Sequence, residues 1–363
     1  MTRKRRIAVM TGGGDCPGIN AVIRAVAKKA IYEHGFEVVG IEDGYEGLIH
    51  RRYCRLGTNE VSGILPLGGT ILGTSNISDP YAYSAPGRSP LARRDVSKRV
   101  IANLASLHVE ALICVGGDGT FASAVRLMRD GVPIVGVPKT IDNDLRGTER
   151  TFGFDTAVSI ATEAIDRVHS TAQSHHRVMI VEVMGRRAGW IALHSGIAGG
   201  GDIILIPEIP FALESIGAKI AERKTQGKRF SIVVVAEGAK PVGGEAVVQK
   251  TIAASPDPVR LGGVGFVLGD RIEKMTRTET RAVVLGHLQR GGTPTAYDRI
   301  LATELGVEAV EAVLAGRFGR MVAVRNGRVT TVPLEKVLGG PRTIPLDHPL
   351  IAAARAVGTS FGD

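Results

Sequence analysis

An acidic loop at residues 138–144, with the sequence PKTIDND, contains the residue types that acid–base chemistry needs. Asp142 and Asp144 stand two apart, and in an extended segment two such side chains face the same side. Both carboxylates are therefore expected to point into one cleft, where paired acids can divide base catalysis from metal binding or positioning. Lys139, just before them, is suited to neutralising phosphate. An Asx turn, which uses the acids only to satisfy the local backbone, is the alternative interpretation.

Two glycine-rich loops have the composition of phosphate-binding segments. Residues 11–20 (TGGGDCPGIN) follow an apolar run and open a helical pattern, so an anion could approach the backbone and the free N–H groups of a helix start. This loop lacks the lysine and the spacing of a P-loop, and a plain tight turn explains it equally well. Residues 116–120 (GGDGT) enclose Asp118 between glycines, which suits a magnesium-bound phosphate chain. A simple helix cap is the alternative for Asp118.

Arginines stand in or near three further segments. The stretch VMGRRAGW contains Arg186 and Arg187, HLQRGG contains His287 and Arg290, and Arg281 precedes the latter. A guanidinium group in a glycine-rich loop can hold a phosphate with two parallel hydrogen bonds. Each arginine alone is equally well explained as an exposed side chain, but three such segments together favour a phosphate-rich ligand. With a divalent cation and a carboxylate base, this set indicates phosphoryl transfer without naming the acceptor.

Short apolar runs precede most of these loops and must position them. Five clear runs lie at residues 6–10, 111–115, 177–183, 231–236 and 282–285, and a similar one lies at 132–137. Continuous apolar runs of this length are typical of strands buried on both faces of a parallel sheet. Helical patterns lie at residues 20–30, 156–171 and 296–314. Alternating strands and helices predict an α/β fold, in which ligands bind beyond the carboxyl ends of the strands.

The composition excludes several other classes of protein. Hydrophobic residues make up 44% of the 363 residues, which is enough for a packed core. Aromatic residues are only 4%, which argues against nucleic-acid stacking, and the net charge of +9 owes four charges to residues 3–6. Three cysteines form no disulfide framework, and no apolar run is long enough for a membrane span or a signal peptide. We therefore expect a cytoplasmic protein without nucleic-acid or membrane partners.

The loops, taken in order, resemble the phosphofructokinase family over residues 7 to about 305. GGDGT alone is weak, because NAD kinases and lipid kinases share it, whereas PKTIDND together with GHLQRGG is specific. The matching segments are TGGGDCPGIN, GGDGT, PKTIDND, HHRVMIVEVMGRRAGW, AEGAK and ETRAVVLGHLQRGGTPTAYDR. The resemblance implies phosphorylation of fructose 6-phosphate at its 1-hydroxyl, with Mg²⁺ as cofactor. It also implies two Rossmann-like three-layer domains with mostly parallel sheets and the active site in the cleft between them.

In terms of the family, these domains would be unequal. A larger domain that binds the phosphoryl donor would comprise residues 1–152 and roughly 290–330. A smaller domain that binds the sugar phosphate would comprise residues 153–289. The C-terminal segment, residues 331–363, has weak patterns and receives no role, and residues 75–95 form a long loop of a kind that is often functional. The family also implies a homo-oligomer, a tetramer or alternatively a dimer.

The resemblance implies roles for individual residues. Asp142 would take the proton of the hydroxyl, Asp118 would help to hold Mg²⁺, and Arg186 would stabilise charge on the transferred group. Thr140 and Asp144 would position the sugar and the reacting groups. The 6-phosphate clamp, reaching across from a neighbouring subunit, would be formed by Arg177 and Arg281. The sugar site would also be lined by Met184, Gly185, Glu237, His287 and Arg290. The donor site would be formed by Gly14, Asn76, Gly117, Asp118, Gly119 and Thr120.

The phosphoryl donor is the least determined feature. Gly119 resembles the ATP users of the family, because it leaves space where an aspartate would crowd and repel the α-phosphate of a nucleotide. Lys139 resembles the pyrophosphate users, and Asn76 stands where many relatives have an arginine. We expect ATP to be the donor, because steric exclusion outweighs an added lysine. The alternatives are a pyrophosphate-dependent enzyme, a kinase for another sugar phosphate such as sedoheptulose 7-phosphate, and a non-catalytic metabolite sensor.

Overall fold

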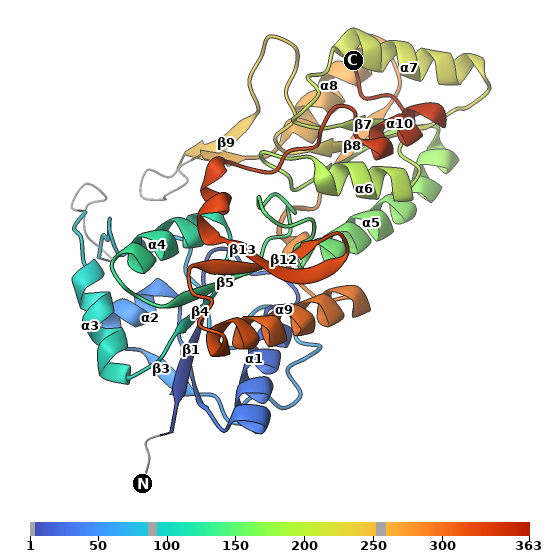
Figure 1. Cartoon of the computed structure of the whole chain (residues 1–363). Helices are drawn as coiled ribbons and strands as arrows, with labels where there is room; N and C mark the ends of the chain where they lie inside the picture. The colour runs from blue at the N-terminus through green and yellow to red at the C-terminus, as the bar shows by residue number, and fades with distance from the viewer. Residues whose placement is uncertain (1–3, 86–92, 252–258) are drawn as a thin grey trace.

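The computed structural model describes residues 4–85, 93–251 and 259–363, and it is an α/β protein with mostly parallel sheets (Figure 1). The larger sheet has seven strands in the order β13-β12-β5-β4-β1-β2-β3. Its inner neighbours pair in parallel, and the edge strands β3 and β13 pair antiparallel. The strands are β1 (Arg6–Thr11), β2 (Glu37–Ile41), β3 (Tyr53–Arg55), β4 (Leu112–Gly116), β5 (Ile134–Pro138), β12 (Arg320–Arg325) and β13 (Arg328–Pro333).

Helices cover both faces of this sheet because its central strands are apolar on both sides. Along β1, Ile7 and Val9 pack into one core, and Ala8 and Met10 pack into the core on the opposite face. This alternation is the two-residue period of a strand. On the first face lie α1 (Ile19–His34) and α9 (Ala296–Leu314), and on the second lie α2 (Tyr45–His50), α3 (Ser97–Leu107) and α4 (Asp118–Arg129). The strands and helices predicted from the apolar runs are confirmed at these positions.

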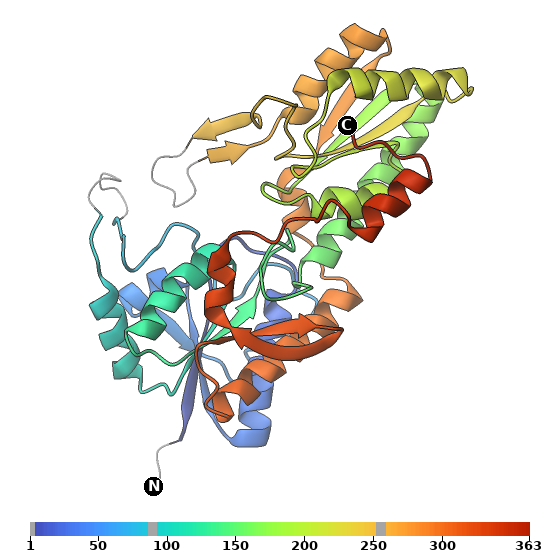
Figure 2. The ribbon, with the colours of Figure 1, turned by 45° about the horizontal axis from the view of Figure 1, so that its top comes forward.

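The smaller sheet has four parallel strands in the order β11-β6-β8-β7. These are β6 (Val178–Val183), β7 (Ile203–Leu205), β8 (Ser231–Ala236) and β11 (Thr280–Val284). One face packs on α5 (Phe154–His175) and α6 (Trp190–Ala198), and the other packs on α7 (Leu213–Thr225) and α8 (Val264–Thr276). A two-stranded ribbon of β9 (Val248–Thr251) and β10 (Val259–Leu261) projects beside this sheet (Figure 2).

Buried polar contacts join the two parts where α5 and α9 begin. The backbone N–H and the hydroxyl of Thr156 both donate to Asp298 Oδ2, at 2.8 and 2.6 Å. The Thr295 hydroxyl in turn donates to Asp155 Oδ2 at 2.6 Å. These bonds hold the first turn of α5 against the first turn of α9. Each helix supplies a carboxylate that accepts from an N–H or hydroxyl group at the start of the other.

The C-terminal segment passes from one part to the other. It leaves β13, forms the 3₁₀ helix η2 (Leu334–Gly339) against α4, and reaches α10 (Pro349–Ala356), which packs against α6 (Figure 1). A second 3₁₀ helix, η1 (Gly286–Arg290), follows β11. Within the described ranges, we find no helix whose length and apolar character would allow it to cross a bilayer.

Candidate active site

The loops that follow β1, β4 and β5 border one cavity of about 400 Å³ at the carboxyl edge of the larger sheet. Parallel strands bring their carboxyl ends to one edge, which explains why loops far apart in the sequence meet here. The cavity is lined by these residues from the sequence prediction: Gly14, Asn76, Gly117, Asp118, Gly119, Thr120, Lys139, Thr140, Asp142, Asp144 and Arg290. The walls do not include the predicted residues Arg177, Met184, Gly185, Arg186, Glu237, Arg281 and His287.

The acidic loop after β5 brings Asp142 and Asp144 to the same cavity, but not as an extended strand. Asn143 between them has a positive φ of 51°, a conformation that asparagine tolerates better than most residues. The loop is held by Thr151, whose N–H donates to Asn143 Oδ1 at 3.1 Å and whose hydroxyl donates to the Thr140 carbonyl at 2.8 Å. The shared direction of the two acids is therefore a property of this turn and not of a two-residue period.

The pKa values of the two carboxyl groups in this loop, Asp142 and Asp144, are raised above the ordinary aspartate value. Burial raises the pKa of Asp142, and the negative charges of Glu237 and Asp118 add to the rise against the positive charge of Arg290. Burial and the charge of Asp142 raise the pKa of Asp144 in the same way. Asp142 Oδ1 is buried and has no hydrogen-bond partner in the structure. A buried carboxylate with a raised pKa and a free oxygen is suited to accept a proton from a ligand hydroxyl.

Two cations support the glycine loop after β1. The Lys139 ammonium donates to the Gly14 carbonyl, and Arg290 Nη1 donates to the Asp15 carbonyl at 3.1 Å. Lys139 is only 4% exposed, and burial lowers its pKa. A backbone loop supported by two cations offers a positive surface to an anion, which favours the anion-binding interpretation of residues 11–20 over a plain tight turn.

The glycines of the loop after β4 differ in how much space surrounds them. A Cβ on Gly116 would lie 2.5 Å from Thr120 side-chain atoms, so the packing there requires glycine. Among the described residues, no atom would lie within 4 Å of a Cβ on Gly119, so neither their packing nor the backbone requires glycine at that position. Asp118 is the first residue of α4, and its Oδ1 accepts the Gly119 N–H at 2.7 Å. Its side chain is 70% exposed at the cavity, where a carboxylate can reach a bound cation.

The smaller sheet approaches this cavity from the other side. Arg187, in the loop between β6 and α6, lies with its Nη1 3.6 Å from Asp118 Oδ2. Burial raises the pKa of Glu237 to about 7, while the charges of Arg290 and Arg186 lower it. Glu237 also raises the pKa of Asp142, so its carboxyl group interacts electrostatically with both Arg186 and Asp142. Arg187 stands in one of the three arginine segments of the sequence, but the family resemblance gives it no role.

Short contacts bring the remaining sugar-site candidates together. The Met184 N–H donates to Gln289 Oε1 at 3.3 Å, which fixes the end of β6 beside η1. The Gly238 N–H donates to the Gly185 carbonyl at 3.1 Å, next to Glu237. His287 is exposed on η1. These residues form a group beside the cavity and not in its wall.

Arg177 and Arg281 lie elsewhere in the chain. They stand at the amino ends of β6 and β11 and share one acid, since Arg177 Nε is 2.7 Å from Glu279 Oε2 and Arg281 Nη2 is 2.6 Å from Glu279 Oε1. The six residues of β6 span about 20 Å, and the loops near the cavity follow its opposite end. Within one chain these two arginines are therefore remote from Asp142.

Several cavity residues were not predicted from the sequence. These are Gly13, Tyr45, Ser75, Ser78, Asp79, Ala122 and Ser123. The signal available for the serines was the polar stretch GTSNISDP, which opens the long loop at 75–95. Residues 86–92 of that loop lie outside the part that the structure describes.

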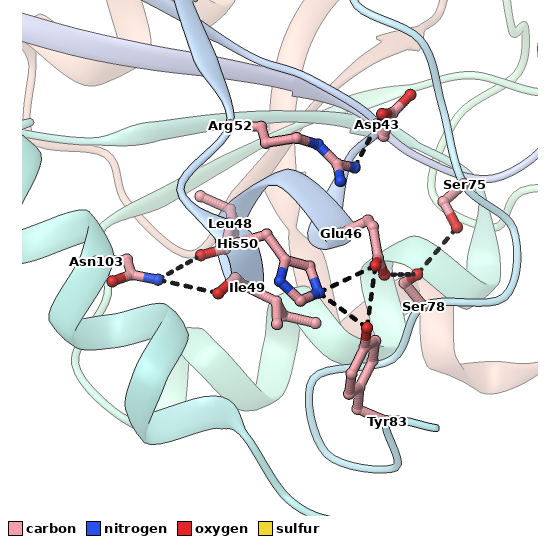
Figure 3. A network of polar contacts seen from close by, with 10 residues as sticks. All are labelled: Asp43, Glu46, Leu48, Ile49, His50, Arg52, Ser75, Ser78, Tyr83 and Asn103. Carbon is pink, nitrogen blue, oxygen red and sulfur yellow. Dashed lines mark hydrogen bonds and ion pairs between the residues drawn. The ribbon is translucent and has the colours of Figure 1, made fainter. Parts of the chain in front are cut away.

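A polar network beneath the cavity supports Ser75 and Ser78 (Figure 3). Glu46 on α2 accepts from the Ser78 hydroxyl at 2.7 Å and from the Tyr83 hydroxyl at 3.0 Å, and the Ser78 hydroxyl lies 3.0 Å from that of Ser75. His50, one turn further along α2, places Nε2 3.1 Å from Glu46 Oε1. A single carboxylate thus holds the turn that forms one side of the cavity.

Comparison with known proteins shows the family of this chain. A sequence model of the family described as phosphofructokinase matches residues 6–313. The chain is 50% identical over 361 residues to a Clostridium perfringens protein named ATP-dependent 6-phosphofructokinase 2, with 99% of each chain covered. It is also 51% identical over 358 residues to a Streptomyces coelicolor protein named pyrophosphate–fructose 6-phosphate 1-phosphotransferase, covering 98% of this chain and 100% of that protein.

A solved structure shows the same arrangement. Phosphofructokinase from Saccharomyces cerevisiae superimposes with a TM-score of 0.76 at 33% sequence identity. The superposition covers 92% of this chain and 45% of the yeast chain, so this chain spans less than half of that larger protein.

Proposed function

Since the chain belongs to the phosphofructokinase family, we propose that it is an ATP-dependent 6-phosphofructokinase. It transfers the γ-phosphoryl group of ATP to the 1-hydroxyl of fructose 6-phosphate and yields fructose 1,6-bisphosphate and ADP. The observation that carries this proposal is the buried, unpartnered Asp142 Oδ1 in a cavity bordered by Asp118, Arg290 and two glycine loops. Phosphoryl transfer depends almost entirely on positioning and electrostatics, and this cavity offers both.

Asp142 is the proposed base. As the oxygen of the 1-hydroxyl bonds to the γ-phosphorus, its proton passes to the Asp142 carboxylate and the bond from the γ-phosphorus to the bridging oxygen breaks. The raised pKa of Asp142 makes the carboxylate a better proton acceptor than an ordinary aspartate. Thr140 and Asp144 keep the loop and the hydroxyl in place, supported by the bond from the Thr140 hydroxyl to Asp144 Oδ1 at 3.3 Å.

The donor occupies the glycine loops in this proposal. The backbone at Gly14 and at residues 117–120 holds the phosphates, Asn76 lies at the rim, and Asp118 holds Mg²⁺. The exposed carboxylate of Asp118 fits a hard cation, because carboxylate oxygens are its usual ligands. When bound, Mg²⁺ supplies charge neutralisation at the β- and γ-phosphates.

The sugar phosphate occupies the side formed by the smaller sheet. Arg186 is proposed to stabilise charge on the transferred group, and Glu237 and Arg290 to hold the sugar hydroxyls. Met184, Gly185 and His287 complete this side through the contacts at the end of β6 and on η1. Glu237 interacts electrostatically with both Arg186 and Asp142, which supports a role for all three groups in one site.

A neighbouring subunit is proposed to complete the site. Arg177 and Arg281 lie together on Glu279 at the far end of their strands, as expected of a phosphate clamp that serves another copy of the chain. A homotetramer and a cytoplasmic location are parts of this proposal. The division into a donor-binding part around the larger sheet and a sugar-binding part around the smaller one is proposed in the same way, and the strand orders support it.

Pyrophosphate as the donor is the second candidate, because Lys139 resembles the pyrophosphate users of the family and lines the cavity, and three 51% identical relatives are named for pyrophosphate. The deciding experiment is a coupled assay of fructose 1,6-bisphosphate formation that offers ATP or pyrophosphate separately. We expect turnover with ATP, and turnover with pyrophosphate alone would overturn the proposed donor. Offering sedoheptulose 7-phosphate in competition tests the acceptor, and absence of turnover with any pair would support a sensor.

A further inference from the structure

The C-terminal segment contains an arginine that touches the proposed catalytic loop. Residues 340–348, which we call the crossing segment, connect η2 on the larger sheet to α10 on the smaller one (Figure 1). The sequence patterns assign no role to this part of the chain. Arg342 lies within it, 198 residues after Asp144, and is mostly buried.

Arg342 bonds to two consecutive backbone carbonyls of the catalytic loop, those of Asn143 and Asp144. Its Nη2 donates to the Asn143 carbonyl at 2.6 Å, and its backbone N–H donates to the Asp144 carbonyl at 2.7 Å. Asn143 is the residue with positive φ, so the loop bends where Arg342 holds it. A peptide in this uncommon conformation persists only when its surroundings determine it, and Arg342 contributes two of the contacts that do so.

The same residue contacts the other part of the molecule. The Arg342 guanidinium carbon lies 4.4 Å from the ring centroid of Trp190, and the indole N–H of Trp190 donates to the Arg342 carbonyl at 2.9 Å. Trp190 is the first residue of α6, directly after the loop that carries Arg186. Glu208 strengthens this junction, because its carboxylate accepts from the Gly189 N–H and, at 2.9 Å, from the Ile344 N–H.

Arginine suits this position for reasons that lysine shares only in part. A guanidinium group is planar, so it can stack on an indole and still direct an N–H into the plane toward a carbonyl. Burial lowers the pKa of Arg342 to about 10, aided by the charge of Arg150, while the charges of Asp144 and Glu149 raise it. The group is therefore still charged at neutral pH. Its Nε is buried and has no hydrogen-bond partner among the described residues, which destabilises the folded state. An apolar side chain could fill this space without that loss, so packing alone does not explain an arginine here.

We propose that Arg342 is a positioning residue: it holds the Asn143–Asp144 backbone against Trp190 and so fixes the catalytic loop relative to the loop that carries Arg186. The proposal deepens the proposed function and rests on it, because Asp142 and Arg186 must flank one phosphoryl group. Misplacing a reacting group by about 1 Å can cost on the order of 10²-fold in rate. We expect the loss to fall mainly on kcat, because Arg342 bonds to the backbone of the loop that carries Asp142 and is not among the groups proposed to touch the substrates.

The test uses the full-length protein, the variants Arg342→Gln and Arg342→Lys, and Arg355→Gln as a matched control. Arg355 lies in the same C-terminal segment and contacts Phe361 and Asp363 but not the catalytic loop. We expect Arg342→Gln to lower kcat about 10²-fold while the KM values for both substrates change less than about threefold. Arg342→Lys should regain about tenfold of that loss, because it keeps the charge but not the planar stack. Arg355→Gln should leave kcat unchanged.

Two further readouts separate this role from a merely structural one. Trp190 is the only tryptophan, so its fluorescence reports on the Arg342 contact, and iodide should quench it more in Arg342→Gln than in the wild type. Hydrogen–deuterium exchange of residues 140–146 should accelerate in that variant. A lowered melting temperature with wild-type kcat, or unchanged exchange in this loop, would overturn the proposal. If the wild type does not phosphorylate fructose 6-phosphate, the proposed function fails, whereas the fluorescence and exchange experiments still decide whether Arg342 holds the loop.

Discussion

At the scale of single residues, Asp142 combines two properties that rarely occur together. Its carboxyl is buried with one oxygen unpaired, and it lies in a cavity between like charges and a guanidinium group. Burying an unpaired carboxylate destabilises a fold, so a residue of this kind is better explained by chemistry than by packing.

We expect Asp142→Asn to lower kcat by about 10²–10⁴-fold, because an amide cannot accept the proton of the hydroxyl. The folded state should not suffer. A raised pKa means that the folded protein holds this proton more tightly than the unfolded chain, so the ionised carboxylate costs stability at neutral pH. Asp166→Asn, on the exposed face of α5, is the control. Steady-state kinetics and thermal unfolding measure both effects, and unchanged turnover would refute the assignment of the base.

The pH dependence of kcat should follow the same carboxyl. The base must be ionised, so kcat falls as the pH drops through its pKa, and burial places that fall above the ordinary aspartate value of about 3.9. Glu237, Asp118, Arg290 and Lys139 are the charged groups that act on it. A pH profile of kcat with saturating substrates measures the position of the acid limb. A limb at or below pH ~3.9 would contradict a buried base.

Gly119 tests the choice of donor. Because a Cβ there meets open space, Gly119→Asp should fold normally and place a carboxylate inside the cavity. We expect a loss of at least about 10²-fold in kcat/KM for ATP, since two negative groups would have to share a desolvated space. Gly119→Ala adds only a methyl group and should retain most activity. ATP kinetics that are unchanged in the aspartate variant would defeat the steric argument.

At the scale of elements, α2 has a role out of proportion to its length. It presents Glu46 to the hydroxyls of Ser78 and Tyr83, while Asn103 on α3 donates to the Leu48 carbonyl at 2.7 Å (Figure 3). The turn at residues 75–79 thus depends on α2, a helix of six residues. The position of α2 is in turn fixed by the side chain of Asn103 on α3.

We expect Glu46→Gln to destabilise the protein by about 1.5–3 kcal/mol, because one carboxylate oxygen that accepts hydrogen bonds becomes an amide donor. The KM for ATP should rise several-fold, while the KM for fructose 6-phosphate should change less, because Ser75 and Ser78 flank Asn76, which is proposed to belong to the donor site. Arg52→Gln is the control: it breaks an exposed ion pair with Asp43 in the same region, worth about 0–1 kcal/mol. Equal changes in both KM values would show that Glu46 does not act through this turn.

At the scale of the whole molecule, the site is expected to be shared between chains. Arg177 and Arg281 meet at Glu279, about the length of a strand from the cavity of their own chain. Arg281→Gln should raise the KM for fructose 6-phosphate about tenfold or more, because a charged hydrogen bond to phosphate is lost.

Mixing two impaired variants tests this arrangement directly, when it is assayed at a fructose 6-phosphate concentration well below the raised KM. If Arg281 serves a neighbouring subunit, refolding Arg281→Gln together with Asp142→Asn restores about a quarter of the sites at random pairing. The activity of the mixture should then exceed the mean of the two variants measured alone. No recovery, with hybrid oligomers verified by mass, would show that each chain completes its own site.

The amino-acid sequence by itself determined six strands, three helices and the phosphate-directed character of the loops between them. Continuous apolar runs such as residues 111–115 and 231–236 must be buried on both faces, so they predict strands of a parallel sheet. The glycine-containing loops with acids and arginines come directly after such runs, so they are expected at the carboxyl ends of these strands. The helix predicted at 296–314 is α9 to the residue. These features depend on local periodicity, which a single segment contains.

Tertiary structure alone decided which of these loops meet. Arg187 follows a strand of the smaller sheet and lies close to Asp118, which follows a strand of the larger one. Arg342 bonds to a loop almost two hundred residues earlier in the sequence. Ser75 and Ser78 line the cavity although their segment has no regular pattern. It also set the direction of Asp142 and Asp144, which a left-handed asparagine and not strand alternation controls. The physical reason is that such contacts depend on how the sheets and helices pack against one another. The residues next to each contacting side chain in the sequence carry no information about that packing.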